Sequence, residues 1–156
     1  MYNTLLMLSR NTFFYSKIKL SDSFETRIYL MFFHFAIMMI IFKKKGSKFN
    51  QKSYDLFFHN IENDLRELGF GDVTVNKKMK ELNKILYDIL LKIDLKADDK
   101  SHFKISHQLI LKYFAQLVDK NSYKFEEFVS YFINFYNFCF DIPLDNMVRD
   151  IISFKN

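Results

Sequence analysis

An apolar run of fifteen residues constrains the fold of this chain more than any other feature of its sequence. From Ile28 to Phe42 every residue except His34 is apolar. Fifteen helical residues rise about 22 Å, which is less than the roughly 30 Å hydrocarbon core of a bilayer. A histidine in mid-segment would also be costly in lipid. We therefore favour a buried central helix over a membrane-embedded one.

The residues that flank the run predict where this helix begins and ends. Asp22 with Glu25 has the spacing of a capping box, which places carboxylates near the positive helix N-terminus. Residues 43–45 are all lysine, which suits the negative C-terminus, and Gly46 suits a left-handed cap. We expect a helix from residue 22 to residue 45.

The rest of the chain also predicts helices. Three Gly and one Pro in 156 residues are too few for the many turns of an all-β protein. Apolar residues at alternating spacings of three and four predict further helices. We place them at 50–68, 75–93, 105–117 and 125–139, with a last short helix that starts at 141–143 and polar linkers at 97–101 and 119–122. The predicted fold is a single all-α domain of about five to six helices around the central apolar one.

The second and third predicted helices should form an antiparallel αα-hairpin. Gly69-Phe70-Gly71 interrupts the pattern between them, and Asp72 follows as a candidate cap. Gly69, Gly71 and Asp72 are therefore interpreted as turn and cap residues.

Residues 1–20 lack the pattern of the later helices. Their apolar start is too short for a cleavable secretory signal, and no small-residue cleavage site follows. An amphipathic leader or an organellar transit peptide is compatible with them, although a bacterial chain is the simpler interpretation. We divide the chain into a leader, 1–20, and a helical domain, 21–156.

Candidate catalytic or metal-binding groups are sparse. His102 and His107 lie five apart, about 140° around a helix, so they are poorly placed to share a metal. Cys139 is the single cysteine, which excludes an internal disulfide and a cysteine-based zinc site. His34 could ligate haem, but a hydrogen-bonded core histidine is the more common outcome. We expect no catalytic residue, no metal and no cofactor.

A dense polar stretch at 62–67 precedes the glycine turn, with Glu62 and Arg66 four apart in the favourable orientation. Lysines of the next helix should lie beside it. The stretch fits a solvated helix face, and it also fits a surface that receives a polar partner. The net charge of +5 favours anionic surroundings, such as phospholipid headgroups or RNA.

The sequence around this turn resembles a known family. Residues 64–72, DLRELGFGD, and 75–80, VNKKMK, resemble the signature of the ubiquinol-cytochrome c chaperone family. Residues 22–27, DSFETR, with His34 resemble its opening helix. The resemblance spans roughly residues 21–95, and residues 97–156 carry no motif that we can match.

This resemblance implies a non-enzymatic helical chaperone that engages newly made cytochrome b or assembly intermediates of the bc1 complex. It implies work at the inner membrane, on the cytoplasmic side in bacteria or the matrix side in mitochondria, with a ribosome or an anionic membrane surface as further partners and no DNA. The client-facing candidates carried over are Asp64, Arg66, Glu67, Lys77 and Lys78.

Two alternatives to a chaperone stay open from the sequence. A basic helical adaptor could bind an anionic membrane surface or RNA through residues 43–45, Lys48 and the lysines of the third predicted helix. An enzyme would need His34 close to Asp64 and Glu67 in a cleft.

Overall fold

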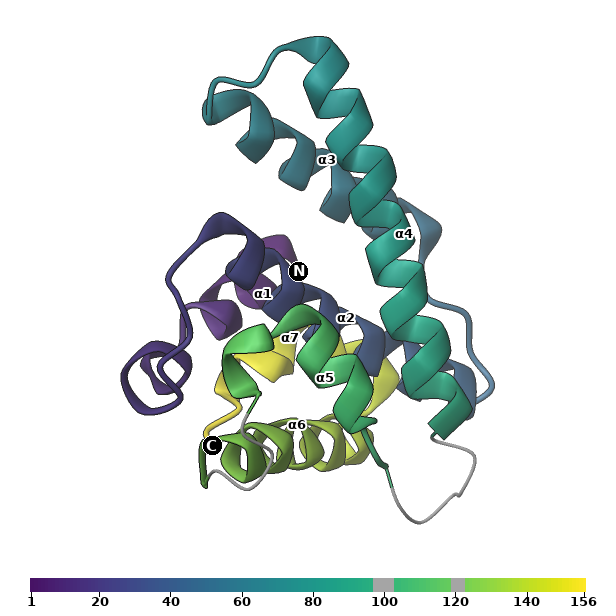
Figure 1. Ribbon diagram of the computed structural model, residues 1–156. Helices are drawn as coiled ribbons and strands as arrows, with labels where there is room; N and C mark the ends of the chain where they lie inside the picture. The colour runs from purple at the N-terminus through teal and green to yellow at the C-terminus, as the bar shows by residue number, and fades with distance from the viewer. Residues whose placement is uncertain (97–102, 119–122) are drawn as a thin grey trace.

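The computed structural model describes residues 1–96, 103–118 and 123–156, and within these ranges it contains helices and no strand (Figure 1). The predicted linkers at 97–101 and 119–122 lie outside the described residues. The α-helices are α1 (Tyr2–Ser9), α2 (Phe24–Lys44), α3 (Gln51–Glu67), α4 (Asp72–Lys96), α5 (His107–Tyr113), α6 (Tyr123–Asp141) and α7 (Leu144–Asp150). Short π-helical or 3-10 turns occupy Phe13–Lys17, Ala115–Leu117 and Ile151–Ser153. The predicted all-α fold with a central apolar helix is confirmed.

Helix α2 lies at the centre of the molecule, where α1, α4 and α6 pack around it (Figure 1). Of its 21 residues 13 are buried, so it has no wide solvent-facing side. It is the one described helix that is long and apolar enough to cross a membrane by length and composition. Because 72% of its most apolar window is buried against the rest of the chain, it packs here as a core helix.

The N-cap of α2 lies one residue later than predicted, and the helix begins at Phe24. Ser23 is the N-cap, and its side-chain oxygen accepts a hydrogen bond from the Thr26 backbone N–H at 3.1 Å. The predicted capping box of Asp22 with Glu25 is therefore wrong. Asp22 instead forms an ion pair with Arg27 at 3.3 Å. A serine oxygen satisfies the orphan N–H as well as a carboxylate does.

Helix α3 ends in a left-handed glycine that turns the chain into α4. Gly69 has φ +91°, its N–H donates to the Arg66 carbonyl at 2.9 Å, and the N–H of Phe70 donates to the Leu65 carbonyl at 3.3 Å. These two bonds define a Schellman motif. Gly46 ends α2 in the same way, with φ +73°, as predicted.

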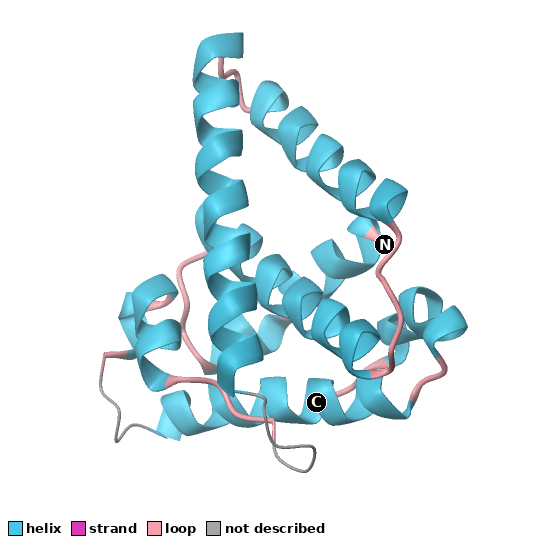
Figure 2. Ribbon diagram, turned by 90° about the vertical axis from the view of Figure 1, so that its right-hand side faces the viewer, coloured by secondary structure: helices cyan, strands magenta, loops and turns pink. Residues whose placement is uncertain are grey.

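The resulting αα-hairpin projects from the helical body with its turn outermost (Figure 2). Helix α4 begins at Asp72, and the carbonyl of Gly71 accepts the bond from the Val75 N–H at 2.9 Å. Asp72 is thus the first residue of the helix rather than the residue before it.

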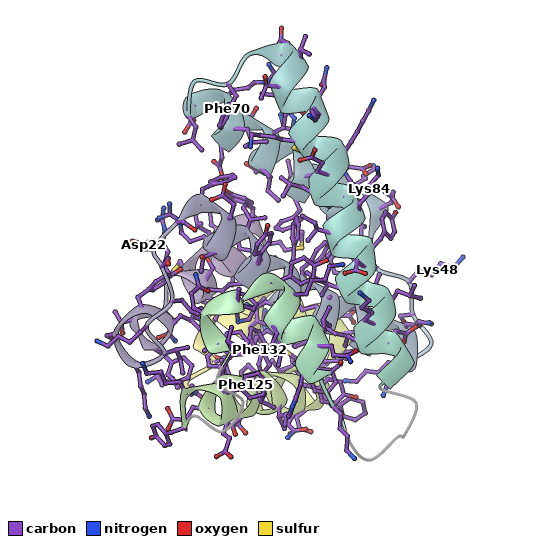
Figure 3. The ribbon with its side chains drawn as sticks, in the orientation of Figure 1. Asp22, Lys48, Phe70, Lys84, Phe125 and Phe132 are labelled. Atoms are coloured by element: carbon purple, nitrogen blue, oxygen red, sulfur yellow. The ribbon has the colours of Figure 1, made fainter. Side chains whose placement is uncertain are left out.

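Helix α6 carries the predicted aromatic stripe into the core. The stripe residues Phe125, Phe128, Phe132, Phe135 and Cys139 are all buried. Figure 3 shows Phe125 and Phe132 inside the body, on the side of α6 that faces the other helices.

The helix predicted over 105–117 is shorter than expected. Helix α5 stops at Tyr113 because Phe114 leaves the helical region, with φ −127° and ψ 65°. This turn brings the buried Phe114 ring to 5.3 Å from that of Phe33 and 4.9 Å from that of Phe128, between centroids.

The first twenty residues pack into the same core. Leu5, Leu8 and Phe14 are buried, and the Phe14 ring lies 4.7 Å from the Tyr131 ring of α6. A leader function for residues 1–20 stays a prediction, but in this conformation they cover part of α2.

We expect Gly69→Ala to destabilise the fold by about 1 kcal/mol, because an L side chain in the left-handed region brings Cβ too close to the backbone. A Cβ at this position meets nothing within 4 Å, so the backbone conformation alone sets the cost. Gly71→Ala is the matched control, since Gly71 also has open space and no positive φ. Chemical denaturation measures both, and equal stabilities of the two variants would contradict this role for Gly69.

Candidate binding site

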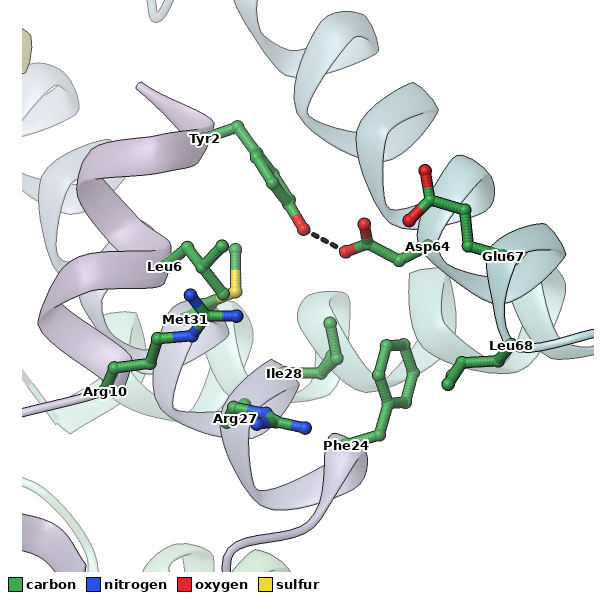
Figure 4. Close-up of a pocket in the computed structure, with 10 residues that line it drawn as sticks. All are labelled: Tyr2, Leu6, Arg10, Phe24, Arg27, Ile28, Met31, Asp64, Glu67 and Leu68. Carbon is green, nitrogen blue, oxygen red and sulfur yellow. Dashed lines mark hydrogen bonds between the residues drawn. The ribbon is translucent and has the colours of Figure 1, made fainter.

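A cleft of about 300 Å³ opens beneath the hairpin, between α1, the first turns of α2 and the last turns of α3 (Figure 4). Its lining comprises Tyr2, Leu6, Arg10, Phe24, Arg27, Ile28, Met31, Asp64, Glu67 and Leu68. Residues far apart in the sequence therefore form one concave surface.

Charged side chains face this cleft from opposite sides. The guanidinium groups of Arg10 and Arg27 lie on the side of α1 and α2, and the carboxylates of Asp64 and Glu67 lie on the side of α3 (Figure 4). Apolar side chains lie between them. Such a surface can take an apolar segment of polypeptide and bind charges of either sign beside it.

A hydrogen bond joins the two sides of the cleft. The Tyr2 hydroxyl of α1 donates to the Asp64 carboxylate of α3 (Figure 4). Partial burial raises the pKa of Tyr2 well above its ordinary value, and the bond to Asp64 raises it further. Tyr2 consequently stays protonated and remains a donor. The bond fixes the start of α1 against α3.

A second cleft of about 200 Å³ lies beside the first, between α2 and α4. The two clefts share Phe24 and Ile28, which therefore lie at the boundary between them. Lys78 and Glu81 supply charges on the α4 side of the second cleft. The hairpin thus covers a continuous, largely apolar surface of α2.

The structure places three of the five client-facing candidates at these clefts. Asp64 and Glu67 line the first, and Lys78 lines the second. The Lys78 ammonium also lies 4.8 Å from the centroid of the Phe70 ring. Lys77 is exposed and lines neither cleft.

Arg66 also lies outside the clefts, and it ties the end of α3 to the start of α4. Its guanidinium donates to Glu62 at 2.7 Å and to the Asp72 carboxylate. The predicted pair of Glu62 with Arg66 is confirmed. These two hydrogen bonds raise the pKa of Arg66. Both ion-pair partners described for Arg66 therefore belong to the hairpin.

Several cleft residues were not predicted from the sequence. Tyr2, Leu6 and Arg10 belong to the segment assigned to a leader, and their spacing carries no motif. Phe24 and Arg27 lie within the 22–27 motif, which was used for the resemblance but not for a site.

His34 is a hydrogen-bonded core histidine, as predicted. Because a carbonyl only accepts, Nδ1 carries the proton and donates to the Leu30 carbonyl at 2.6 Å. Nε2 then accepts from the Tyr131 hydroxyl, whose oxygen lies 3.0 Å away. Complete burial lowers the pKa of His34 to about 4, so the ring is neutral at physiological pH.

This position of His34 contradicts the enzyme hypothesis that paired it with Asp64 and Glu67. Its ring lies against Phe132 and Phe135 of α6, and it is not part of the cleft that holds the two carboxylates.

Of the two histidines considered as a pair, His102 lies outside the described residues. His107 packs edge-on against the Phe125 ring at 4.7 Å between centroids. Within the described part of the chain, no group of three or more His, Cys, Asp or Glu residues could hold a metal ion.

The comparisons with known proteins found one family. The family model described as "Ubiquinol-cytochrome C chaperone" matches residues 16–154. The match extends well beyond the 21–95 region that carried the sequence resemblance and includes α5, α6 and α7. No curated protein and no solved structure matches the chain.

The burial of His34 predicts a loss of stability at mildly acidic pH. Its pKa is about 4 in the folded protein against an ordinary value of 6.5, so the unfolded chain binds the proton more tightly. The free energy of unfolding therefore keeps its full value above pH 6.5. It decreases by roughly 3 kcal/mol as the pH falls from 6.5 to 4.

Urea unfolding at a series of pH values measures this dependence. His34→Gln should lower stability at neutral pH but show a shallower fall between pH 6.5 and 4. His59→Gln, at an exposed histidine, should retain the full fall. An unchanged slope in His34→Gln would rule out His34 as the titrating group.

Proposed function

The chain belongs to the ubiquinol-cytochrome c chaperone family, and we propose that it is an assembly factor for the respiratory cytochrome bc1 complex that binds newly made cytochrome b. The family match over residues 16–154 is the observation that carries this proposal. The matched region includes most of the residues that line each cleft, because α2, α3 and α4 all fall within it.

The two clefts beneath the hairpin are our proposed client site. A segment of a membrane protein that has not yet been inserted exposes apolar side chains, and these would lie on the partly exposed Leu6 and Phe24, beneath which Ile28 and Met31 are buried. Charged groups that flank such a segment would pair with Arg10 on one side or Asp64 on the other. The exposed Leu68 at the rim adds apolar surface.

We propose that the protein acts by binding alone, without catalysis and without a cofactor. Its place of action would be the surface of the inner membrane, where cytochrome b is inserted. That is the cytoplasmic side in a bacterium and the matrix side in a mitochondrion.

We expect Asp64→Asn with Glu67→Gln to keep the fold and lower the cellular content of the bc1 complex. The amide oxygen introduced by Asp64→Asn can still accept from the Tyr2 hydroxyl, whereas both negative charges are lost. Two such charges at solvent-accessible sites contribute about 1 kcal/mol each at most, so capture of cytochrome b by crosslinking should fall by up to roughly thirtyfold.

Glu126→Gln with Asp145→Asn is the matched control, because it removes the same charges from exposed sites outside both clefts. Equal capture of cytochrome b by the two double variants would exclude the first cleft as the client site.

Arg66→Ala with Lys78→Ala tests the basic residues of the hairpin in the same assay. We expect retained helicity and lower bc1 content, because Lys78 lies at the second cleft and Arg66 holds the turn in place. Normal bc1 content in this variant would count against Arg66 and Lys78 as part of the client site.

A further inference from the structure

The outer face of α4 carries an exposed stripe of lysine, tyrosine and aliphatic side chains. The α4 stripe consists of Val73, Lys77, Lys80, Lys84, Tyr87 and Leu91, all of them exposed. Their spacings of four and three keep them within an arc of about 80° over a length of about 27 Å. Its three lysines lie in the middle, and its apolar side chains lie at the two ends.

The charge of the α4 stripe is not compensated by its neighbours. No ion pair engages Lys77, Lys80 or Lys84 in the described part of the chain. Of the nearest carboxylates on α4, that of Glu81 forms no described ion pair with these lysines, and that of Asp88 is occupied. Glu81 lines the second cleft, and Asp88 binds Lys92 at 2.7 Å and Lys112 at 2.8 Å.

The other lysine cluster of the sequence is engaged within the molecule. Lys43 pairs with Asp94, and Lys45 donates to the carbonyl of Ile142 at 3.0 Å. Lys44 lies 5.6 Å from the centroid of the Tyr136 ring. The α4 stripe is therefore the better candidate for contact with an anionic partner.

We propose that the α4 stripe docks the protein on an anionic phospholipid bilayer. Lysines near such a surface are attracted to its headgroups, and tyrosine and aliphatic side chains favour the interface between headgroups and acyl chains. The exposed fractions of Val73, Tyr87 and Leu91 are 85%, 60% and 61%, and a phosphate backbone of RNA would leave the two aliphatic side chains in water. The combination favours lipid over RNA.

Docking by this face leaves the clefts accessible. Helix α4 runs along one edge of the molecule, and Lys84 points outward from it, as does Lys48 of the loop between α2 and α3 (Figure 3). Leu82 and Ile85 of the second cleft lie on the opposite side of α4 from the α4 stripe. The proposal does not depend on the identity of the client.

Vesicle co-sedimentation of the full chain tests the proposal. The protein should bind vesicles of two thirds phosphatidylcholine and one third phosphatidylglycerol, and not vesicles of phosphatidylcholine alone. Lys77→Gln, Lys80→Gln and Lys84→Gln together should weaken this binding roughly 100-fold, from the attraction of three lysines to an anionic leaflet.

The matched control neutralises three other exposed lysines, as Lys104→Gln, Lys124→Gln and Lys155→Gln. It changes the net charge equally and should retain most of the binding. Circular dichroism checks that both variants are folded. Equal binding by the two triple variants, or no binding by the unchanged protein, would overturn the proposal.

A second pair of double variants distinguishes binding to lipid from binding to RNA. Tyr87→Ser with Leu91→Ser should weaken vesicle binding, whereas Val118→Ser with Ile152→Ser, at exposed sites outside the α4 stripe, should not. If the α4 stripe binds single-stranded RNA more tightly than vesicles, and Tyr87→Ser with Leu91→Ser leaves vesicle binding unchanged, the lipid assignment is wrong.

Discussion

The removal of α2 from water is the constraint on which the rest of this structure depends. A helix that is apolar around its whole circumference cannot face solvent on any side, so other helices must surround it. Each fully buried Phe or Leu side chain contributes about 1.5 to 3 kcal/mol. Helices α1, α4 and α6 provide the cover, and α3 packs in turn on α1 and α4.

The clefts follow from how this cover is arranged. Part of α4 packs on α2. The N-terminal end of α4 rises with α3 away from the body (Figure 2). The first turns of α2 are then covered by α1 on one side and only partly by the hairpin on the other. A bond between Tyr2 and Asp64 spans the remaining gap. The same helix thus supplies the centre of the core and, through the partly exposed Phe24 and Tyr29, part of the lining of the clefts.

Much of this fold could be predicted because its signals are local. The apolar run of α2, the stripe of α6 and the glycine after α3 are each set by residues close in sequence. Residues 1–20 could not be placed, since Leu5 and Phe14 become core residues only through contacts with distant helices. For the same reason the motif at residues 64–72 identified Asp64 and Glu67. It did not identify the α1 residues that line the other side of the first cleft.

A core built from so many phenylalanine rings raises the question of how α6 finds one alignment on α2. The rings of Phe125, Phe128, Phe132 and Phe135 recur at nearly equal intervals, so sliding the helix by one turn would exchange like for like. The buried pair of His34 and Tyr131 is not interchangeable in this way. Any shifted alignment would leave a desolvated hydroxyl and ring nitrogen unpaired, at about 1 to 3 kcal/mol for each group. One polar contact can therefore select a unique register within an otherwise repetitive aromatic interior.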